Sequence, residues 1–252
     1  MIDCILLAGS PNDGPLAAVS DEAYEALIPI GDSPIIDYVL RALLDCREIN
    51  HVLVVGPSDL NAVIPLGGRV ELLPPAGGLM ENLEQGLKAL GDEQHVLVAT
   101  SDIPLITGPI VERFLAQCGD RSAEVYYPVV TEDTVAARYT GAKRTYVRLR
   151  EGRFTGGNMA LLHSSAYERC RRLAALFAEN RKKPLKLARI VGIGLLLRFV
   201  TGTLSLQAVE SKVTALAGIT GRALVCQDPE IAVDVDKPED YELVLRELGK
   251  LH

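Results

Sequence analysis

The architecture expected of this chain follows from one segment, Val96-Leu97-Val98-Ala99-Thr100-Ser101-Asp102-Ile103-Pro104-Leu105. Its apolar run predicts a buried strand, and Pro104 prevents that strand from simply continuing. Asp102 is therefore expected at the carboxyl edge of a sheet, where α/β proteins bind ligands. A carboxylate in that place suits Mg²⁺, which commonly takes one or two carboxylates. Capping of the next helix or turn would also account for it.

Short apolar runs alternate with helical patterns along the first half of the chain. One helical pattern begins at Pro34 and places Ile35, Val39 and Leu43 on one face. Such alternation predicts an α/β fold with a doubly wound, mainly parallel sheet in three layers. The expected strands are Asp3–Ala8, His51–Gly56, Arg69–Leu73, His95–Thr100 and Glu124–Val130, and the expected helices are Pro34–Asp45, Leu79–Leu90 and Gly108–Cys118.

The second half of the chain has a different pattern. Residues 131–145 are polar and turn-prone, and a helical pattern over 166–217 is broken near Lys183-Pro184 and Gly192 to Gly194. We expect one domain over residues 1–252, with a helical insertion at about 166–217. Its most apolar stretch, Ile190–Leu197, is far short of the ~20 residues of a membrane span and predicts a buried helix. The other expected elements are an edge strand Thr145–Leu149, strands Met159–His163 and Ala223–Gln227, and a closing helix Glu239–Leu248.

Composition excludes several classes of protein. Hydrophobic residues make up 48% and charged residues 23%, which is typical of a globular chain. The net charge of −7 argues against nucleic-acid binding, because that binding depends on cations that neutralise phosphates. Five scattered cysteines without a CxxC motif, and no recognisable signal segment, predict reduced thiols, a cytoplasmic location and no membrane span.

A glycine-bearing loop, Leu7-Ala8-Gly9-Ser10, follows the first expected strand. Backbone N–H groups in such a loop can point at a phosphate or a base, although a plain tight turn is the alternative. Neither a Walker A loop nor a GxGxxG fingerprint is present. No Lys or Arg occurs between Met1 and Leu40. The charge of a triphosphate would therefore have to be neutralised by a metal or by later residues.

A second acidic segment, Asp234-Val235-Asp236-Lys237-Pro238-Glu239-Asp240, lies near the end of the sequence. Asp234 and Asp236 are two residues apart, so they face the same way in an extended chain. Pro238 suits the first turn of a helix, and Asp236 could be the N-cap of that helix. Asp234 has no such structural explanation.

Further candidates for substrate binding lie in the second half. Lys143 and Arg144 are adjacent cations near a turn and could grip a phosphate. Gly157 and Asn158 leave room for a ligand and supply an amide that can both donate and accept hydrogen bonds. Lys183 belongs to a second basic cluster that could reach a ligand. Solvated surface charge is the alternative for all three cations.

Taken in order, these segments resemble the nucleotidyltransferase family of MobA-like NTP transferases, which includes molybdenum cofactor guanylyltransferase and the cytidylyltransferases of sugar and isoprenoid pathways. The resemblance implies the fold of the nucleotide-diphospho-sugar transferases, a GT-A-like Rossmann variant. It rests on Leu7-Ala8-Gly9, Ala26-Leu27-Ile28-Pro29-Ile30 with Pro34-Ile35-Ile36, Glu81-Asn82-Leu83, Ser101-Asp102-Ile103-Pro104-Leu105 and Asp234-Val235-Asp236-Lys237-Pro238-Glu239-Asp240.

The same resemblance implies roles for individual residues. Asp102 and Asp236 would share one Mg²⁺. The family's loop usually reads GxGxR with a Lys further on, whereas here Glu25 stands near the place of that Lys. Lys143, Arg144 or Lys183 would have to replace the two cations. The residues expected to border the nucleotide are Leu7, Ala8, Gly9, Ser10, Gly77, Gly78 and Asn82, and those expected to line the pocket of the second substrate are Gly157 and Asn158.

The expected activity is Mg²⁺-dependent transfer of an NMP group from an NTP, CTP or GTP, to a small phosphorylated or hydroxylated acceptor, with release of pyrophosphate. A homodimer is compatible with this expected activity. One alternative is a nucleotide-sugar-dependent glycosyltransferase, suggested by Asp234-Val235-Asp236. Another is a nucleotide-binding relative that has lost the loop cations and does not turn over.

Overall fold

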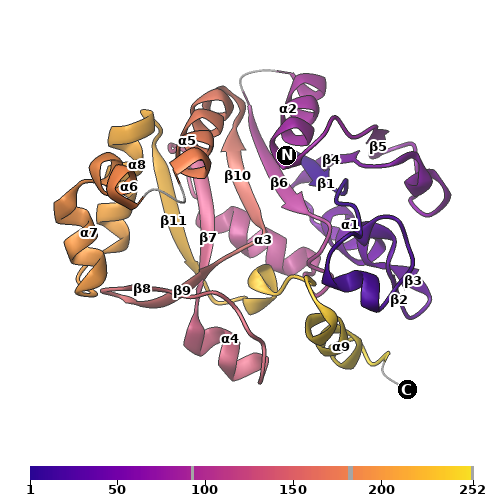
Figure 1. Ribbon diagram of the computed structural model, residues 1–252. Coiled ribbons are helices and arrows are strands. Elements are labelled where there is room, and N and C mark those ends of the chain that lie inside the picture. The colour runs from indigo at the N-terminus through magenta and orange to yellow at the C-terminus, as the bar shows by residue number, and fades with distance from the viewer. Residues whose placement is uncertain (92–93, 181–183, 251–252) are drawn as a thin grey trace.

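A computed structural model describes residues 1–91, 94–180 and 184–250 of the chain. Its centre is a nine-stranded sheet, counted over these described residues, with helices on both faces (Figure 1). The strands lie in the order β5-β4-β1-β6-β10-β7-β9-β8, and β11 also pairs with β7. Their bounds are β1 Ile2–Leu7, β4 Ile49–Val55, β5 Val70–Leu73, β6 His95–Thr100, β7 Val125–Thr131, β8 Val147–Leu149, β9 Gly152–Gly156, β10 Met159–His163 and β11 Gly221–Cys226.

The sheet is mixed but mostly parallel, as the alternation of strands and helices predicted. Strands β5, β4, β1 and β6 run parallel to one another, and β11 runs parallel to β7. Strand β10 is antiparallel to both β6 and β7, β9 is antiparallel to β7, and β8 is antiparallel to β9. The carboxyl ends of β1, β4 and β6 therefore lie at one edge of the sheet.

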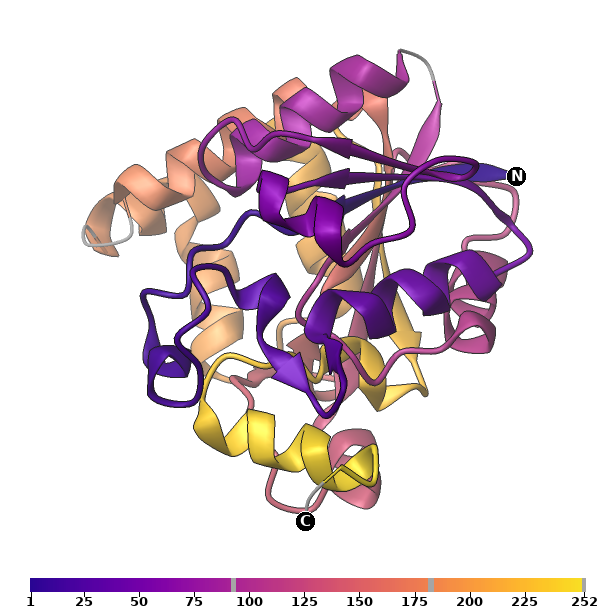
Figure 2. The same cartoon turned by 90° about the vertical axis from the view of Figure 1, so that its right-hand side faces the viewer.

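Alternate side chains of β1 supply the two faces of the sheet, because successive residues of a strand point to opposite sides. Cys4 and Leu6 pack in one buried cluster with residues of α1 (Ile35–Asp45) and α3 (Gly108–Gln117). Ile5 and Leu7 pack in another cluster, together with Leu87 of α2 (Leu79–Leu90). One cluster joins α1 and α3 to one face of the sheet, and the other joins α2 to the opposite face. The result is the three-layer arrangement that Figure 2 shows from the side.

The segment expected to be helical contains four helices in its described part. They are α5 (Tyr167–Asn180), α6 (Pro184–Val191), α7 (Ile193–Val200) and α8 (Leu206–Ala217). The break at Gly192 is confirmed, since this residue has a positive φ of 94° and separates α6 from α7.

The prediction that Ile190–Leu197 forms one buried helix is wrong. The stretch is divided between α6 and α7, and α7 has no buried residue. Periodicity predicts that a helix has an apolar face, but it does not say whether that face meets a core or solvent. Across the described residues, none of the helices is both long and apolar enough to cross a bilayer.

The polar segment after β7 forms a helix that the composition did not predict. Helix α4 spans Glu132–Arg138, and the Thr131 side chain caps it by accepting a hydrogen bond from the backbone N–H of Thr134 (3.1 Å). Glu132 and Asp133 then lie in the first turn, where negative charge is favourable. The hairpin strand β9 was also not predicted.

The remaining elements are short or lie at the carboxyl edge of the sheet. Helix α9 is the expected closing helix, and it begins and ends one residue earlier than predicted. Strands β2 and β3 form a separate two-stranded sheet. The bounds are η1 Pro15–Ala18, η2 Glu25–Leu27, β2 Pro29–Ile30, β3 Ser33–Pro34, η3 Ser58–Ala62, η4 Ser164–Ala166, η5 Pro229–Ala232 and α9 Pro238–Glu247.

Candidate active site

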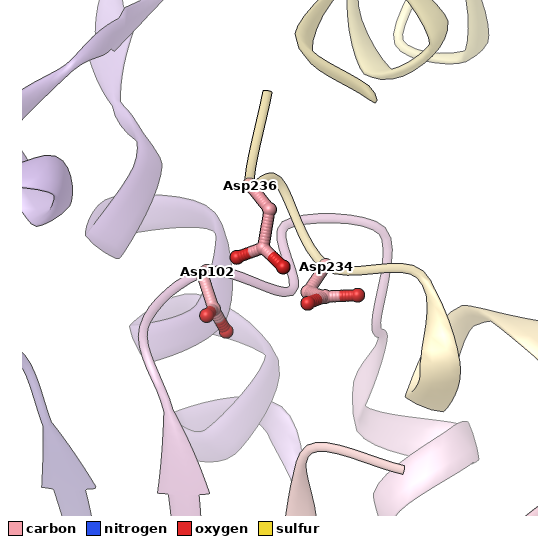
Figure 3. A group of neighbouring side chains, drawn as sticks. All are labelled: Asp102, Asp234 and Asp236. Carbon is pink, nitrogen blue, oxygen red and sulfur yellow. The ribbon is translucent and has the colours of Figure 1, made fainter. Parts of the chain in front are cut away.

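Three carboxylates converge beyond the carboxyl end of β6 (Figure 3). Asp102 follows this strand, and Asp234 and Asp236 lie in the extended segment between η5 and α9. One oxygen from each of the three side chains lies within 4.8 Å of the other two. The fold therefore brings the two residues predicted to share a metal next to each other and adds Asp234 to them.

Backbone hydrogen bonds fix the two acidic segments against each other. The N–H of Val235 donates to the carbonyl of Asp102 (2.9 Å), and the N–H of Asp236 donates to the carboxylate of Asp240 (3.4 Å). The N-cap of α9 is Lys237, and the N-cap of α3 is Thr107. Neither Asp102 nor Asp236 is therefore a helix N-cap, which was the structural alternative for Asp236 and one of the two, with a turn, for Asp102.

Two carboxylates of this cluster, Asp102 and Asp236, bind protons more tightly than usual. Burial raises the pKa of Asp102 to about 6, with the charges of Asp234 and Glu25 adding to the effect and a hydrogen bond from Thr100 opposing it. Burial raises the pKa of Asp236 to about 7, helped by its hydrogen bond to Asp234 and by the neighbouring negative charges. These shifts mean that burial, and after it the unbalanced negative charge of the neighbouring carboxylates, disfavours the ionised forms of Asp102 and Asp236.

This imbalance fits a divalent cation. Hard oxygen donors from three side chains converge, and Mg²⁺ and Ca²⁺ prefer such donors. The residues present could therefore hold Mg²⁺, the ion that the resemblance implies.

Arg144 forms ion pairs and a hydrogen bond with the acidic segment. Its guanidinium lies 3.3 Å from the carboxylate of Asp234 and 3.2 Å from that of Asp240, and it donates to the carbonyl of Asp234 (2.7 Å). Its side chain is only 7% exposed. The sequence suggested that Arg144 grips a phosphate; in the structure it contacts Asp234 and Asp240, and it also lines a cavity beside them.

A cavity of about 360 Å³ opens in front of the carboxylates. Its wall includes the loop after β1, the start of α2 and the end of β6. Among the residues expected to border a nucleotide, Ala8 does not line this cavity, because it is 1% exposed and packs in the core. The expected residues that do line it are Leu7, Gly9, Ser10, Gly77, Gly78 and Asn82.

The described wall of this first cavity contains no Lys or Arg. Glu25 faces it in place of the family's usual cation, and burial together with the charges of Asp236 and Asp13 raises the pKa of Glu25. Gly78 is the N-cap of α2, and since it has no side chain, no side chain caps the helix there. Gly78 also lines the cavity, so the N-terminal end of α2 borders it. A helix N-terminus carries partial positive charge and free N–H groups that suit an anion.

Asn82 and Gly9 depend on each other. The Asn82 side chain is buried, and its oxygen accepts hydrogen bonds from the backbone N–H groups of Ala76 (2.7 Å) and Gly77 (3.2 Å). A Cβ atom on Gly9 would lie 2.7 Å from the side-chain nitrogen of Asn82. Glycine at this position therefore lets Asn82 hold the loop before α2.

A second cavity, of about 250 Å³, lies on the other side of the acidic segment. Lys143 and Lys237 line it, and it shares Asn158, Asp234 and Asp236 with the first cavity. The two cavities thus meet at the carboxylates. Three cations, Lys143, Arg144 and Lys237, line the second cavity together with three carboxylates, and the two lysines could bind an anionic group of a ligand.

Another predicted residue, Gly157, lines neither of these cavities. Gly157 packs against Ile231, where a Cβ atom would lie 2.5 Å from the Ile231 Cγ2 atom, and its N–H donates to the carbonyl of Pro128 (2.9 Å). Its small size therefore serves the packing of the β7–β9 region. Lys183 lies outside the described residues.

Sequence reasoning left three residues of the site without a role there. Asp234 could have been assigned from its spacing to Asp236, since both point to the same side of an extended segment. Lys237 was noted only as part of the acidic motif. Glu25 was noted only because it stands near the place of the family's lysine. That it adds a fourth carboxylate to the site was not predicted, because a sequence does not show which cavity a loop side chain faces.

Comparison with known proteins places the chain in a family. Residues 22–189 match the MobA-like NTP transferase domain. A structure described as a hypothetical transferase from Thermus thermophilus is 39% identical, covers 95% of this chain and 99% of its own, and superposes with a TM-score of 0.81. No curated protein matches the chain.

More distant structures share the fold. The 4-diphosphocytidyl-2C-methyl-D-erythritol synthase of Anaerococcus prevotii is 11% identical with a TM-score of 0.61, over 99% of this chain and 96% of its own. A CMP:2-keto-3-deoxy-manno-octonic acid synthetase, solved in complex with CTP, is 14% identical with a TM-score of 0.59, over 99% of both chains. Because the domain match covers most of the sequence and the Thermus structure nearly all of it, this chain belongs to the MobA-like NTP transferase family.

Proposed function

We propose that this protein is a Mg²⁺-dependent nucleotidyltransferase that moves an NMP group from an NTP to a small phosphorylated acceptor. The observation that carries the proposal is the meeting of two cavities at Asp234 and Asp236, next to the Asp102 carboxylate, which lines the first cavity. One cavity would hold the nucleotide and the other the acceptor. The reacting groups would then be brought together beside the carboxylates.

On the nucleotide side, the glycine loops would lie against the base and the ribose, since Gly9, Gly77 and Gly78 leave room for close approach. The N-terminal end of α2 would face the phosphates. Asp102 and Asp236, with Asp234 beside them, would hold Mg²⁺. When bound, this ion would neutralise triphosphate charge and make the α-phosphorus more electrophilic.

On the acceptor side, Lys143 and Lys237 would bind the acceptor's phosphate. An acceptor oxygen attacks the α-phosphorus, a new P–O bond forms, and the bond to the α,β-bridging oxygen breaks, so that pyrophosphate leaves with the electron pair. Asn158 lines both cavities and would position the two substrates relative to each other. Positioning supplies much of the rate in reactions of this type.

One feature supports nucleotidyl transfer over glycosyl transfer, and another has to be reconciled with it. The family assignment favours it over glycosyl transfer, for which Asp234-Val235-Asp236 was the only indication. The cation-free first cavity is the feature that a non-catalytic relative would also have. The proposal accounts for it by assigning the neutralisation of charge to the metal and to the start of α2.

The test is a pyrophosphate-release screen with Mg²⁺, in which the four NTPs are combined with phosphorylated sugars, polyols and alcohols. We expect one NTP and acceptor pair to release pyrophosphate in the wild type and not in Asp102→Asn. Nucleotide binding without release on any acceptor would support the non-catalytic alternative. Glycosyl transfer from a nucleotide sugar, without pyrophosphate, would support the glycosyltransferase.

A further inference from the structure

Helix α7 carries an apolar stripe that faces solvent. Ile193, Leu196, Leu197 and Val200 have the i, i+3, i+4, i+7 spacing of a single helix face, and they are 68%, 40%, 59% and 75% exposed. In a globular helix, a stripe with this spacing normally faces the core. Only the other side of α7 packs inward, where Leu195 contacts the buried cluster that includes Phe154. The exposed stripe can therefore be buried against an apolar surface or lipid phase outside the chain.

The helices around this stripe are basic, although the chain as a whole is acidic. From residue 167 to residue 217 the sequence has 10 Lys or Arg and 3 Asp or Glu, a net charge of +7, whereas the rest of the chain has a net charge of −14. Arg189, Arg198 and Lys212 belong to these helices, and none of them forms an ion pair with another described residue. Their charge is therefore available to an anionic partner.

Helices α6 and α7 lie on the side of the molecule toward which the parallel strands run. In Figure 2 the arrowheads of β1, β4 and β5 point toward the left of the view, and the orange helices α6 and α7 also lie there. A surface that contacts α7 would accordingly lie on the side where the two cavities open.

We propose that α7 and its basic neighbours dock this protein on an anionic lipid bilayer. The apolar stripe enters the boundary between headgroups and acyl chains, and the cations attract anionic headgroups, which is how amphipathic surface helices bind membranes. The charges favour this occupant over a second copy of the chain. A two-fold interface through α7 would place one net-positive segment against another.

The experiment measures binding of the full chain to vesicles by co-sedimentation. We expect binding to vesicles of phosphatidylglycerol and phosphatidylcholine in equal parts, and binding weaker by about tenfold or more to phosphatidylcholine alone or at high salt. The double variant Ile193→Asp, Val200→Asp should bind the anionic vesicles about tenfold or more weakly than wild type.

The matched control is Val63→Asp, Leu66→Asp. These exposed apolar residues lie just before β5, at the opposite edge of the sheet from β8, and this variant adds the same charge. It should bind like wild type. A second variant, Lys186→Glu, Arg189→Glu, leaves the stripe intact and should also weaken binding to anionic vesicles. Circular dichroism and thermal unfolding would confirm that each variant is folded.

Three outcomes would overturn the proposal. In the first, the folded wild type does not bind anionic vesicles. In the second, the α7 variant and the β5-edge control lose equal affinity. In the third, the wild type self-associates in ultracentrifugation, Ile193→Asp, Val200→Asp is monomeric, and neither binds vesicles, so that the stripe joins two copies of the chain. None of these outcomes bears on nucleotidyl transfer, which the pyrophosphate screen tests separately.

Discussion

The backbone N–H of Val235 donates a hydrogen bond to the carbonyl of Asp102, at 2.9 Å, and so joins two acidic segments that are far apart in the sequence. This bond places Asp234 and Asp236, on either side of Val235, next to the Asp102 side chain. The positions of the three carboxylates are therefore set by backbone hydrogen bonding as well as by side-chain contacts. The first prediction concerns the carboxylates themselves.

Asp102→Asn and Asp236→Asn should each lower the rate of nucleotidyl transfer by about a thousandfold or more, because each removes a charged oxygen that would hold the metal. The rate of pyrophosphate release at saturating substrates is the measurement. Asp228→Asn is the control. Its carboxylate pairs with the exposed Arg113 outside both cavities, and its rate should stay near that of wild type. Equal rates in all three variants would remove the carboxylates from the mechanism.

The metal-free protein should lose stability as the pH rises from about 4 to about 7. Asp102 and Asp236 have pKa values of about 6 and about 7 in the folded state, above the value of ~3.9 for an unfolded Asp. The folded state then binds more protons than the unfolded state in this window, so the free energy of unfolding falls as the pH increases. Added Mg²⁺ should restore stability above this window.

Urea unfolding with a chelator, at about pH 5 and about pH 8, measures this effect. Asp102→Asn should lose less stability between the two pH values than wild type does, by about 2 kcal/mol, and should respond less to Mg²⁺. Asp228→Asn again serves as the control and should follow wild type. A wild-type stability that rises over the same window would contradict the assignment.

Arg144→Met should destabilise the protein by about 3 to 5 kcal/mol, because it leaves the buried charges of Asp234 and Asp240 without their partner. Arg41→Met removes an exposed ion pair with Asp37 and should cost less than about 1 kcal/mol. Both values can be measured by urea unfolding. If Arg144→Met instead unfolds like wild type and only raises the KM for NTP, the guanidinium acts on phosphate, as the sequence first indicated.

Lys143→Ala should raise the KM for the acceptor by about tenfold and leave the KM for NTP nearly unchanged, since this side chain lines only the second cavity. Lys237→Ala should behave in the same way. Lys88→Ala removes a cation from the exposed pair with Glu84 on α2 and should change neither constant. An increase confined to the KM for NTP would reverse the assignment of the two cavities.

Gly9→Ala should raise the KM for NTP by about tenfold, because the new Cβ atom would lie 2.7 Å from the Asn82 side chain and displace the loop that Asn82 holds. Gly14→Ala lies in the same stretch between β1 and η1 and meets no atom within 4 Å, so its kinetics should match wild type. If the two variants behave alike, the contact between Gly9 and Asn82 does not shape the nucleotide cavity.

The central sheet could be predicted because its signals are local. The strand that ends before Asp102 is a short apolar run followed by a proline, and both features act within a few residues. Helix α4 was missed because its signal is the Thr131 cap and not an apolar face. The exposed stripe of α7 was assigned to a core because a sequence shows that a stripe exists and not what covers it.

The site was less predictable, because it depends on which loops meet. Asp102 and Asp236 could be named from their motifs, whereas the ion pairs of Arg144 depend on how the loop before β8 meets Asp234 and Asp240, which come much later in the chain. Gly157 looked like a ligand-binding glycine. The close approach of Ile231, a residue far along the chain, explains it as a packing position.

The docking of Val235 on Asp102 has a consequence for synthesis on the ribosome. The strands from β1 to β7 are complete long before the segment with Asp234 and Asp236 emerges, and a chain without that segment has a single carboxylate where three should converge. A nascent chain can thus form most of its sheet while lacking a metal site. The site for nucleotide chemistry would then be complete only after residues 234–236 have left the ribosome and Val235 has bonded to Asp102.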